Sequence, residues 1–130
     1  MEKPEYVIIL AGVNDIYQGR GVEHVKSNLA AMYARAASAG ILVVAATILP
    51  YNTMSKRQAE DIRELNRWVR KEAEDLDLLF CDTSAAASDP ADQNKLRGSP
   101  DGLHPDVSGY RRMGERLANT IEERESESGT

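Results

Sequence analysis

The run Ile41-Leu42-Val43-Val44-Ala45, which opens an apolar stretch over residues 41–49, decides the fold of this chain. Every position in it is apolar, and strands of this kind are buried on both faces, as in a parallel sheet covered by helices. A second run, Val7-Ile8-Ile9-Leu10, has the same character and indicates a strand over residues 6–11. A shorter third strand is expected over residues 76–81.

Segments with helical spacing alternate with these strands. Apolar residues recur every three or four positions over 22–39, and Gly40 follows as a helix-ending glycine. Ser55 and Gln58 form a capping-box pattern that opens a second helix, whose apolar side carries Ala59, Ile62, Leu65, Val69 and Ala73. A final helix is marked by Val107, Tyr110, Met113, Leu117 and Ile121. Because strands alternate with helices, we expect an α/β fold with a parallel sheet.

The other segments are expected to be irregular. Residues 83–100, rich in Ala, Ser, Asp, Pro and Gly, predict a long loop. Residues 122–130 predict a polar, frayed C-terminal tail, which leaves residues 1–121 as one domain. The first strand is uncharged and has no upstream partner, although natural edge strands are usually short, charged or interrupted. It therefore reads as an interior strand that lacks its neighbour.

The composition restricts the classes of function. The 130 residues carry 16 basic and 21 acidic side chains and a net charge of −5. This balance argues against nucleic acid as a partner, because phosphate binding needs clustered Lys and Arg. No apolar run approaches the roughly 18 residues of a membrane span. No secretory signal is present at residues 1–4, so a cytoplasmic location is expected unless an N-terminal segment is missing. Cys81 is the single cysteine and is expected to be buried.

The stretch Asp101-Gly102-Leu103-His104-Pro105 carries an acid and an imidazole three residues apart. In a turn before a helix, these two side chains can form a dyad in which the carboxylate orients the imidazole and stabilises its protonated form. Such a dyad serves a nucleophile. The alternative is a surface turn that leads into the final helix, with Pro105 near the helix start and Asp106 as its cap.

A second motif, Gly12-Val13-Asn14-Asp15, follows the first strand. Gly12 permits a sharp turn and a close approach of the backbone, and the Asn14 amide could donate a hydrogen bond to a developing oxyanion. The alternative is an Asx turn that caps the strand. In parallel sheets ligands bind at the carboxyl ends of the strands, and both motifs, together with Tyr51-Asn52 after the second long strand, fall there.

Together and in this order, the two motifs resemble those of the SGNH hydrolases, also called GDSL-type esterases and lipases. Gly12-Val13-Asn14-Asp15 is similar to the third conserved block of that family, and Asp101-Gly102-Leu103-His104-Pro105 to the last block. The resemblance covers about residues 3–121. It implies a flavodoxin-like three-layer α/β/α sandwich, here truncated to about three strands, and a carboxylic ester hydrolase acting on a small ester without a cofactor. It further implies that Asn14 and Gly12 belong to the oxyanion site. Asp101 would be the acid that orients the imidazole of His104, and His104 would be the general base.

One part of the family pattern is absent. No Gly-Asp-Ser block, which carries the nucleophilic serine in that family, occurs in this sequence, nor does the second block with its oxyanion glycine. The chain resembles the C-terminal two-thirds of such an enzyme and is expected to be weak or inactive alone. Neither Ser84 nor Ser99 lies where a nucleophile elbow would place it, and a dyad-activated water would lack covalent catalysis.

Other interpretations remain open. The bare strand over residues 6–11 could pair with a second copy of the chain, giving a non-catalytic, self-associating domain, or with a missing N-terminal segment. Gly19-Arg20-Gly21 is the one candidate for a phosphate-binding loop. Asp15, Asp101 and His104 could converge on a metal ion, although no metal is expected. His24 is expected to be a solvated helix residue.

Overall fold

The computed structural model describes residues 4–128 and has a three-stranded parallel sheet in the order β1-β2-β3. The strands are β1 Tyr6–Ile9, β2 Leu42–Ala46 and β3 Leu79–Cys81. The long helices are α2 Val22–Ser38, α3 Lys56–Asp75 and α5 Val107–Ser128. Two short helices, α1 Val13–Tyr17 and α4 Thr83–Ala87, and a hairpin of β4 Ser88–Asp89 and β5 Asp92–Leu96 complete the described part of the chain.

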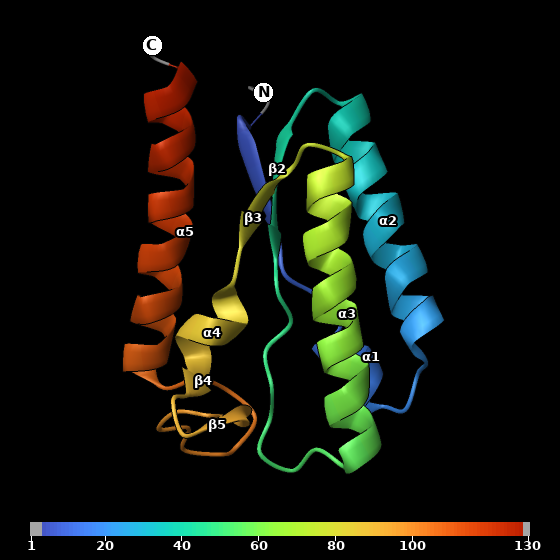
Figure 1. The fold of residues 1–130 in the computed structure, drawn as a ribbon, viewed down its shortest axis with the longest axis vertical. Helices are drawn as coiled ribbons and strands as arrows, with labels where there is room; N and C mark the ends of the chain where they lie inside the picture. The colour runs from blue at the N-terminus through green and yellow to red at the C-terminus, as the bar shows by residue number, and fades with distance from the viewer. Residues whose placement is uncertain (1–3, 129–130) are drawn as a thin grey trace.

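The elements form three layers. Helices α2 and α3 lie on one side of the sheet and α5 lies on the other, with the sheet seen almost edge-on between them (Figure 1). Strand β2 pairs with β1 from Tyr6–Leu42 to Ile9–Ala45, and with β3 from Val44–Leu79 to Ala46–Cys81. The expected α/β fold with a parallel sheet of about three strands is thus confirmed.

The core lies mainly between the sheet and the helices α2 and α3. Ile9, Val43 and Ala45 of the sheet face this layer, and Tyr33 stacks on Trp68 with ring centroids 6.2 Å apart. All five α3 positions marked by the sequence are buried, namely Ala59, Ile62, Leu65, Val69 and Ala73. Their spacing follows one side of a helix, so the pattern alone locates the buried side of α3.

The predicted helix boundaries are confirmed where local chemistry sets them. The Ser55 hydroxyl accepts a hydrogen bond from the Gln58 N–H at 3.1 Å, and the Gln58 side chain accepts one from the Ser55 N–H at 2.9 Å. Gly40 has a φ of 71°, the left-handed conformation that favours glycine after a helix. Asp106 caps α5, because its carboxylate accepts from the Gly109 N–H at 2.7 Å.

The segment over residues 83–100 is not the long loop that its composition predicts. Asp82 caps α4 by accepting from the Ala85 N–H at 3.1 Å, and the Thr83 hydroxyl donates to the Thr47 carbonyl at 2.7 Å. The Leu96 N–H in β5 donates to the Asn52 side chain at 2.9 Å. These partners lie more than 30 positions away from Thr83 and Leu96 along the chain. The local composition of residues 83–100 therefore could not predict these hydrogen bonds.

The expectations for α5 and for the strand ends are also corrected. Helix α5 continues to Ser128, so residues 122–128 are helical rather than frayed. Val107 and Tyr110 are 76% and 52% exposed, and only Met113 among the five marked positions is fully buried. Helix α5 packs on α4 and β3, which cover only part of its apolar side.

The three strands are two to four residues shorter than predicted, and the 6–11 strand ends at Ile9.

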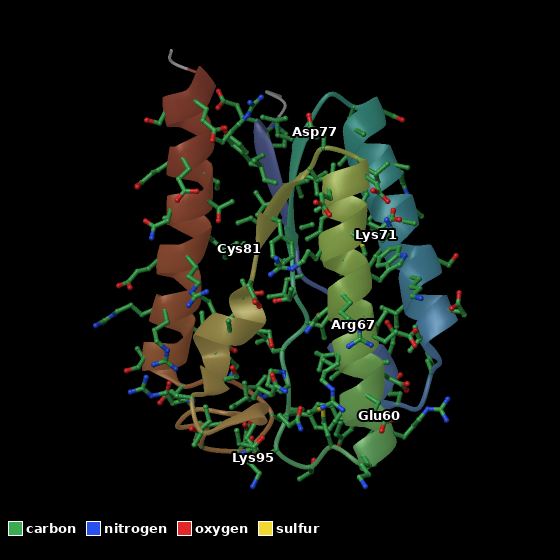
Figure 2. The ribbon with its side chains drawn as sticks, viewed as in Figure 1. Glu60, Arg67, Lys71, Asp77, Cys81 and Lys95 are labelled. Carbon is green, nitrogen blue, oxygen red and sulfur yellow. The ribbon has the colours of Figure 1, made fainter. Side chains whose placement is uncertain are left out.

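Cys81 lies on the α5 side of β3 and is buried, as expected (Figure 2). Burial raises the pKa of its thiol, so the neutral form persists at neutral pH. No helix within residues 4–128 has the length and apolar character needed to cross a membrane.

Gly12 connects β1 to α1 in a conformation that only glycine adopts readily. Its φ is 120°, and an added Cβ would lie 2.8 Å from Val25 Cγ1 and 3.2 Å from Ile48 Cδ1. Both the backbone conformation and the packing therefore demand glycine here. The tight turn carries the chain directly from the sheet into Asn14.

Replacing Gly12 with alanine should lower the free energy of unfolding by about 2 kcal/mol or more, because strain and a steric clash add. Urea denaturation followed by circular dichroism measures this change. Gly114→Ala is the matched control: Gly114 lies within α5 with open space around it, so alanine should be neutral or stabilise by about 0.5 to 1 kcal/mol. Equal stability of the Gly12→Ala variant and the unchanged chain would contradict the proposed packing role.

Candidate active site

Asp101 and His104 form the dyad that their spacing predicts. The imidazole Nδ1 lies 2.7 Å from Asp101 Oδ2, and both side chains are more than half exposed. The other carboxylate oxygen, Oδ1, accepts from the backbone N–H groups of His104 at 2.8 Å and Leu103 at 2.9 Å. One carboxylate thus closes the turn with one oxygen and orients the imidazole with the other.

This hydrogen bonding sets the charge of the pair. The hydrogen bond from the His104 side chain, followed by those from the backbone of His104 and Leu103, holds the pKa of Asp101 well below its usual range. An ionised Asp101 favours the tautomer in which Nδ1 carries the proton and Nε2 keeps a lone pair. Within residues 4–128 no group hydrogen-bonds to Nε2, so this nitrogen is free to accept a proton.

Ser99 has a structural role in the loop over residues 97–106, which carries Asp101 and His104 and is called the dyad loop. Its hydroxyl donates to the His104 carbonyl oxygen at 2.6 Å, lies 3.3 Å from Asp101 Oδ1, and accepts from the Gly102 N–H at 2.9 Å. A hydroxyl has one proton to donate, and here the carbonyl takes it. Ser99 therefore supports the turn and does not reach the imidazole nitrogens.

Asn52 ties the dyad loop to the sheet. Its N–H donates to the Gly102 carbonyl at 2.7 Å, and its side-chain oxygen accepts from the Leu96 N–H at 2.9 Å. Gly102 has a φ of 74°, and an added Cβ would lie 3.2 Å from the Asn52 Cβ. Asn52 therefore positions the dyad loop against the segment that follows β2. Sequence reasoning placed Asn52 at a strand end without this role; its position there is the only signal.

Asn14 lies in α1, immediately after β1, at the same carboxyl edge of the sheet as the dyad loop (Figure 1). Its side chain is exposed and has no hydrogen-bond partner in the described part of the chain. Tyr17 of α1 meets Tyr51 edge-to-face at 5.4 Å, which joins α1 to the loop that also holds Asn52. The structure thus brings Asp101 and His104 into contact, whereas Asn14 shares their edge and forms no hydrogen bond with either side chain.

Asp15 does not join the dyad. Its carboxylate pairs with Arg20 at 3.1 Å and lies 3.7 Å from His24 Nε2, so His24 is exposed but not free of contacts. Among residues 4–128 no group of three His, Cys, Asp or Glu side chains could hold a metal ion. The suggested convergence of Asp15 with Asp101 and His104 is therefore wrong.

The pKa of Asp101 can be followed by carbon-detected NMR of its carboxyl group. We expect a midpoint below the ordinary value of about 3.9, and His104→Ala should raise it, because the His104 side chain is the largest cause of the shift. The backbone donors remain, so the pKa should stay below the ordinary value. The ionised carboxylate stabilises the loop above the ordinary pKa, and this contribution is lost as the pH falls through the lowered one.

His24→Ala serves as the control for this titration, because His24 lies beside Asp15 rather than Asp101. It should leave the Asp101 midpoint unchanged. An Asp101 midpoint that is ordinary in the unchanged chain, or one that His104→Ala does not move, would disprove the hydrogen-bonded dyad in solution.

The fold is similar to those of several solved structures. A GDSL-like lipase from Bacteroides thetaiotaomicron has a TM-score of 0.81 at 24% identity, over 93% of this chain and 63% of that one. A lipolytic protein of the G-D-S-L family from Desulfitobacterium hafniense has a TM-score of 0.76 at 27% identity, over 91% and 66%. A mutant acetyl-xylooligosaccharide esterase from Geobacillus stearothermophilus has a TM-score of 0.75 at 20% identity, over 92% and 60%.

This chain spans less than two thirds of the length of each of those structures. No curated protein sequence matches it significantly. The family model of the GDSL-like lipases and acylhydrolases matches residues 1–112, which include Gly12, Asn14, Asp101 and His104. The chain therefore belongs to the GDSL-like lipase/acylhydrolase family.

Proposed function

We propose that this chain carries the acid–base pair and one oxyanion donor of a serine-type hydrolase of small carboxylic esters. The observation that carries the proposal is the Asp101–His104 contact of 2.7 Å, with Nε2 of His104 left free. A turn in which the backbone N–H groups of Leu103 and His104 donate to Asp101 fixes this geometry. Membership of the GDSL-like family supports the reaction class.

The dyad would act by moving one proton in each half-reaction. His104 Nε2 takes the proton of a serine hydroxyl as that oxygen attacks the ester carbonyl, and then gives it to the departing alcohol. Asp101, which stays ionised, stabilises the imidazolium formed between these events. The free amide of Asn14 donates to the oxyanion, a contribution of roughly 3 kcal/mol to transition-state stabilisation in comparable sites.

The nucleophile has no counterpart in this chain. No Gly-Asp-Ser occurs in the sequence, and no serine hydroxyl of residues 4–128 hydrogen-bonds to His104 Nε2. Ser99 donates to a backbone carbonyl, and Ser84 lies in α4 with its N–H held by Thr47. We infer that the chain alone hydrolyses esters weakly or not at all.

We expect no burst of product and no activity above background with p-nitrophenyl acetate, and His104→Ala should change nothing, because no nucleophile is present for the dyad to activate. A stopped-flow assay measures both quantities. A stoichiometric burst that His104→Ala abolishes would show that another residue of this chain serves as nucleophile.

The dyad itself is tested by supplying a nucleophile, in a fusion that places a Gly-Asp-Ser-bearing segment of a family member before residue 1. Hydrolysis should appear and should fall by about a thousand-fold or more in His104→Ala, and by about a hundred-fold in Asn14→Ala. Replacing the added serine with alanine is the control. If the fused protein gained activity that did not depend on His104, the proposed role of the dyad would be wrong.

A second function, self-association, is favoured by the free edge of β1. Among the described strands β1 pairs only with β2, and Ile8, Leu10 and Leu42 beside this edge are 45%, 36% and 39% exposed. Tyr6, Ile8 and Leu10 alternate with the residues that face α2 and α3, so the exposed side chains lie on the opposite side of the sheet. We propose that two β1 edges can pair around a two-fold axis and continue the sheet.

Sedimentation velocity at increasing protein concentration tests this pairing. The unchanged chain should shift from monomer to dimer, and Ile8→Lys should remain monomeric because a charge at an edge strand opposes pairing. Leu76→Lys is the control, since Leu76 is 53% exposed after α3 and away from this edge. A monomer at the highest soluble concentration, or equal loss of the dimer in both variants, would rule out association through β1.

A further inference from the structure

A cavity of about 450 Å³ lies on the opposite edge of the sheet from β1, between α3 and the segment that contains α4 and the β4–β5 hairpin. The free edge of β3, with Phe80, forms part of its wall. Neither Asp101 nor His104 lines it, and neither does Asn14. It is therefore separate from the candidate active site.

Three arginines of α3 line this cavity: Arg63, Arg67 and Arg70. Their spacing of four and three residues places them on one side of the helix. Figure 2 shows Arg67 on α3 between Glu60 and Lys71. Like charges at this spacing repel each other, which costs stability unless a counter-charge is present.

The three arginines have no paired carboxylate in the described part of the chain, although Asp82 and Asp89 also line the cavity. Arg20, Lys26, Arg57 and Lys71 each have a carboxylate partner, whereas none of the three cavity arginines forms an ion pair with a residue of 4–128. A bound anion would supply the missing charge.

The acidic residues that line the cavity are engaged elsewhere. Asp82 accepts from the Thr47 hydroxyl at 2.8 Å and from the Ala85 N–H at 3.1 Å. Asp89 accepts from the Ala91 N–H at 2.9 Å. These carboxylates shape the backbone around α4 and do not pair with the guanidinium groups.

Two of the three guanidinium groups are already oriented. Arg63 Nη1 donates to the Asn94 side chain at 3.0 Å, and the Arg70 guanidinium lies 4.7 Å from the centre of the Phe80 ring. These contacts leave other N–H groups of both side chains free, because a guanidinium carries five donors. Oriented donors bind an anion with a smaller loss of side-chain entropy.

The rest of the lining indicates what kind of anion fits. The same cavity that the three arginines line also has apolar surface, which comes from Pro50, Met54, Ile62 and Phe80. A planar guanidinium matches the two oxygens of a carboxylate or phosphate group. We propose that this cavity binds a small organic anion, with its carboxylate or phosphate on Arg63, Arg67 and Arg70 and its apolar part against Phe80 and Met54.

Arginine side chains also line a second cavity beside this one. Arg97, Arg112 and Arg116 line a neighbouring cavity of about 320 Å³, which shares Ala85, Ser88 and Pro90 with the first. Glu115 is the one acid in that second lining. Clustered charges of one sign raise the local concentration of counter-ions, so an approaching anion would be drawn toward this edge of the sheet.

The probes are phenyl phosphate and benzoate, which share an apolar ring and differ in their anionic group, with inorganic phosphate and uncharged benzyl alcohol for comparison. Isothermal titration calorimetry gives the affinities, and amide NMR shifts of the full chain locate the site. We expect the ringed anions to bind more tightly than inorganic phosphate, the alcohol not to bind, and the shifts to centre on Arg63, Phe80 and Asn94. The tighter of the two ringed anions identifies the preferred charged group.

Arg67→Gln should weaken this binding by about ten-fold, because it removes a charge-assisted contact. Arg67 is exposed and forms no hydrogen bond or ion pair within residues 4–128, and circular dichroism would verify that the variant is folded. Arg35→Gln, on the exposed surface of α2, is the matched control and should bind like the unchanged chain. No binding of either ringed anion at about 10 mM, shifts centred on His104, or an equal loss in both variants would overturn the proposal.

Discussion

The burial of β2 on both faces is the constraint on which the rest of this structure depends. Val43, Val44, Ala45 and Ala46 are at most 2% exposed, which requires a helical layer on each side and a strand at each edge. Because the three strands are parallel, their carboxyl ends meet at one edge of the sheet. Gly12, Asn52 and the loop after the β4–β5 hairpin are gathered at that edge, and so is the candidate active site.

The dyad loop combines a local device with a tertiary one. Asp101 closes its own turn and holds His104, which needs only residues three positions apart. The placement of this turn depends on Asn52, which contacts Gly102 and Leu96 from the segment after β2. The exposed Asp101–His104 pair is thereby tied to the segment that follows a buried strand, which gives the imidazole a defined orientation without burying it.

Much of the fold follows from the sequence, and each miss has an identifiable physical reason. The apolar runs of β1 and β2, the buried side of α3 and the capping box at Ser55 are local patterns, and all are present, although both strands are shorter than predicted. The order within residues 83–100 comes from Thr47, Asn52 and Arg63, which lie far away in the chain. The exposure of Val107 and Tyr110 arises because α5 has only α4 and β3 to pack on.

The two edges of the sheet also differ in a way that no motif predicts. The β1 edge is apolar and unpaired within the described chain. Beside the β3 edge, two neighbouring cavities next to α4 are lined by arginines, three from α3 in one cavity and Arg97, Arg112 and Arg116 in the other. Along the sequence these arginines alternate with acids and read as ordinary solvated helix faces. Their common location becomes visible only once α3, α4 and α5 are placed around β3.

The sequence by itself determined the parallel α/β fold, the family and the Asp101–His104 pair, because each depends on residues close together along the chain or on a simple repeat of apolar positions. Only the tertiary structure decided that Asn52 positions the dyad loop, that Ser99 supports the turn, and that Asp15 pairs with Arg20 instead of joining His104. It also decided that the three arginines of α3, Arg63, Arg67 and Arg70, line one cavity beside β3. The reason is physical: side-chain hydrogen bonds and charges act over a few ångströms in space, and the chain must fold before distant residues come within that range.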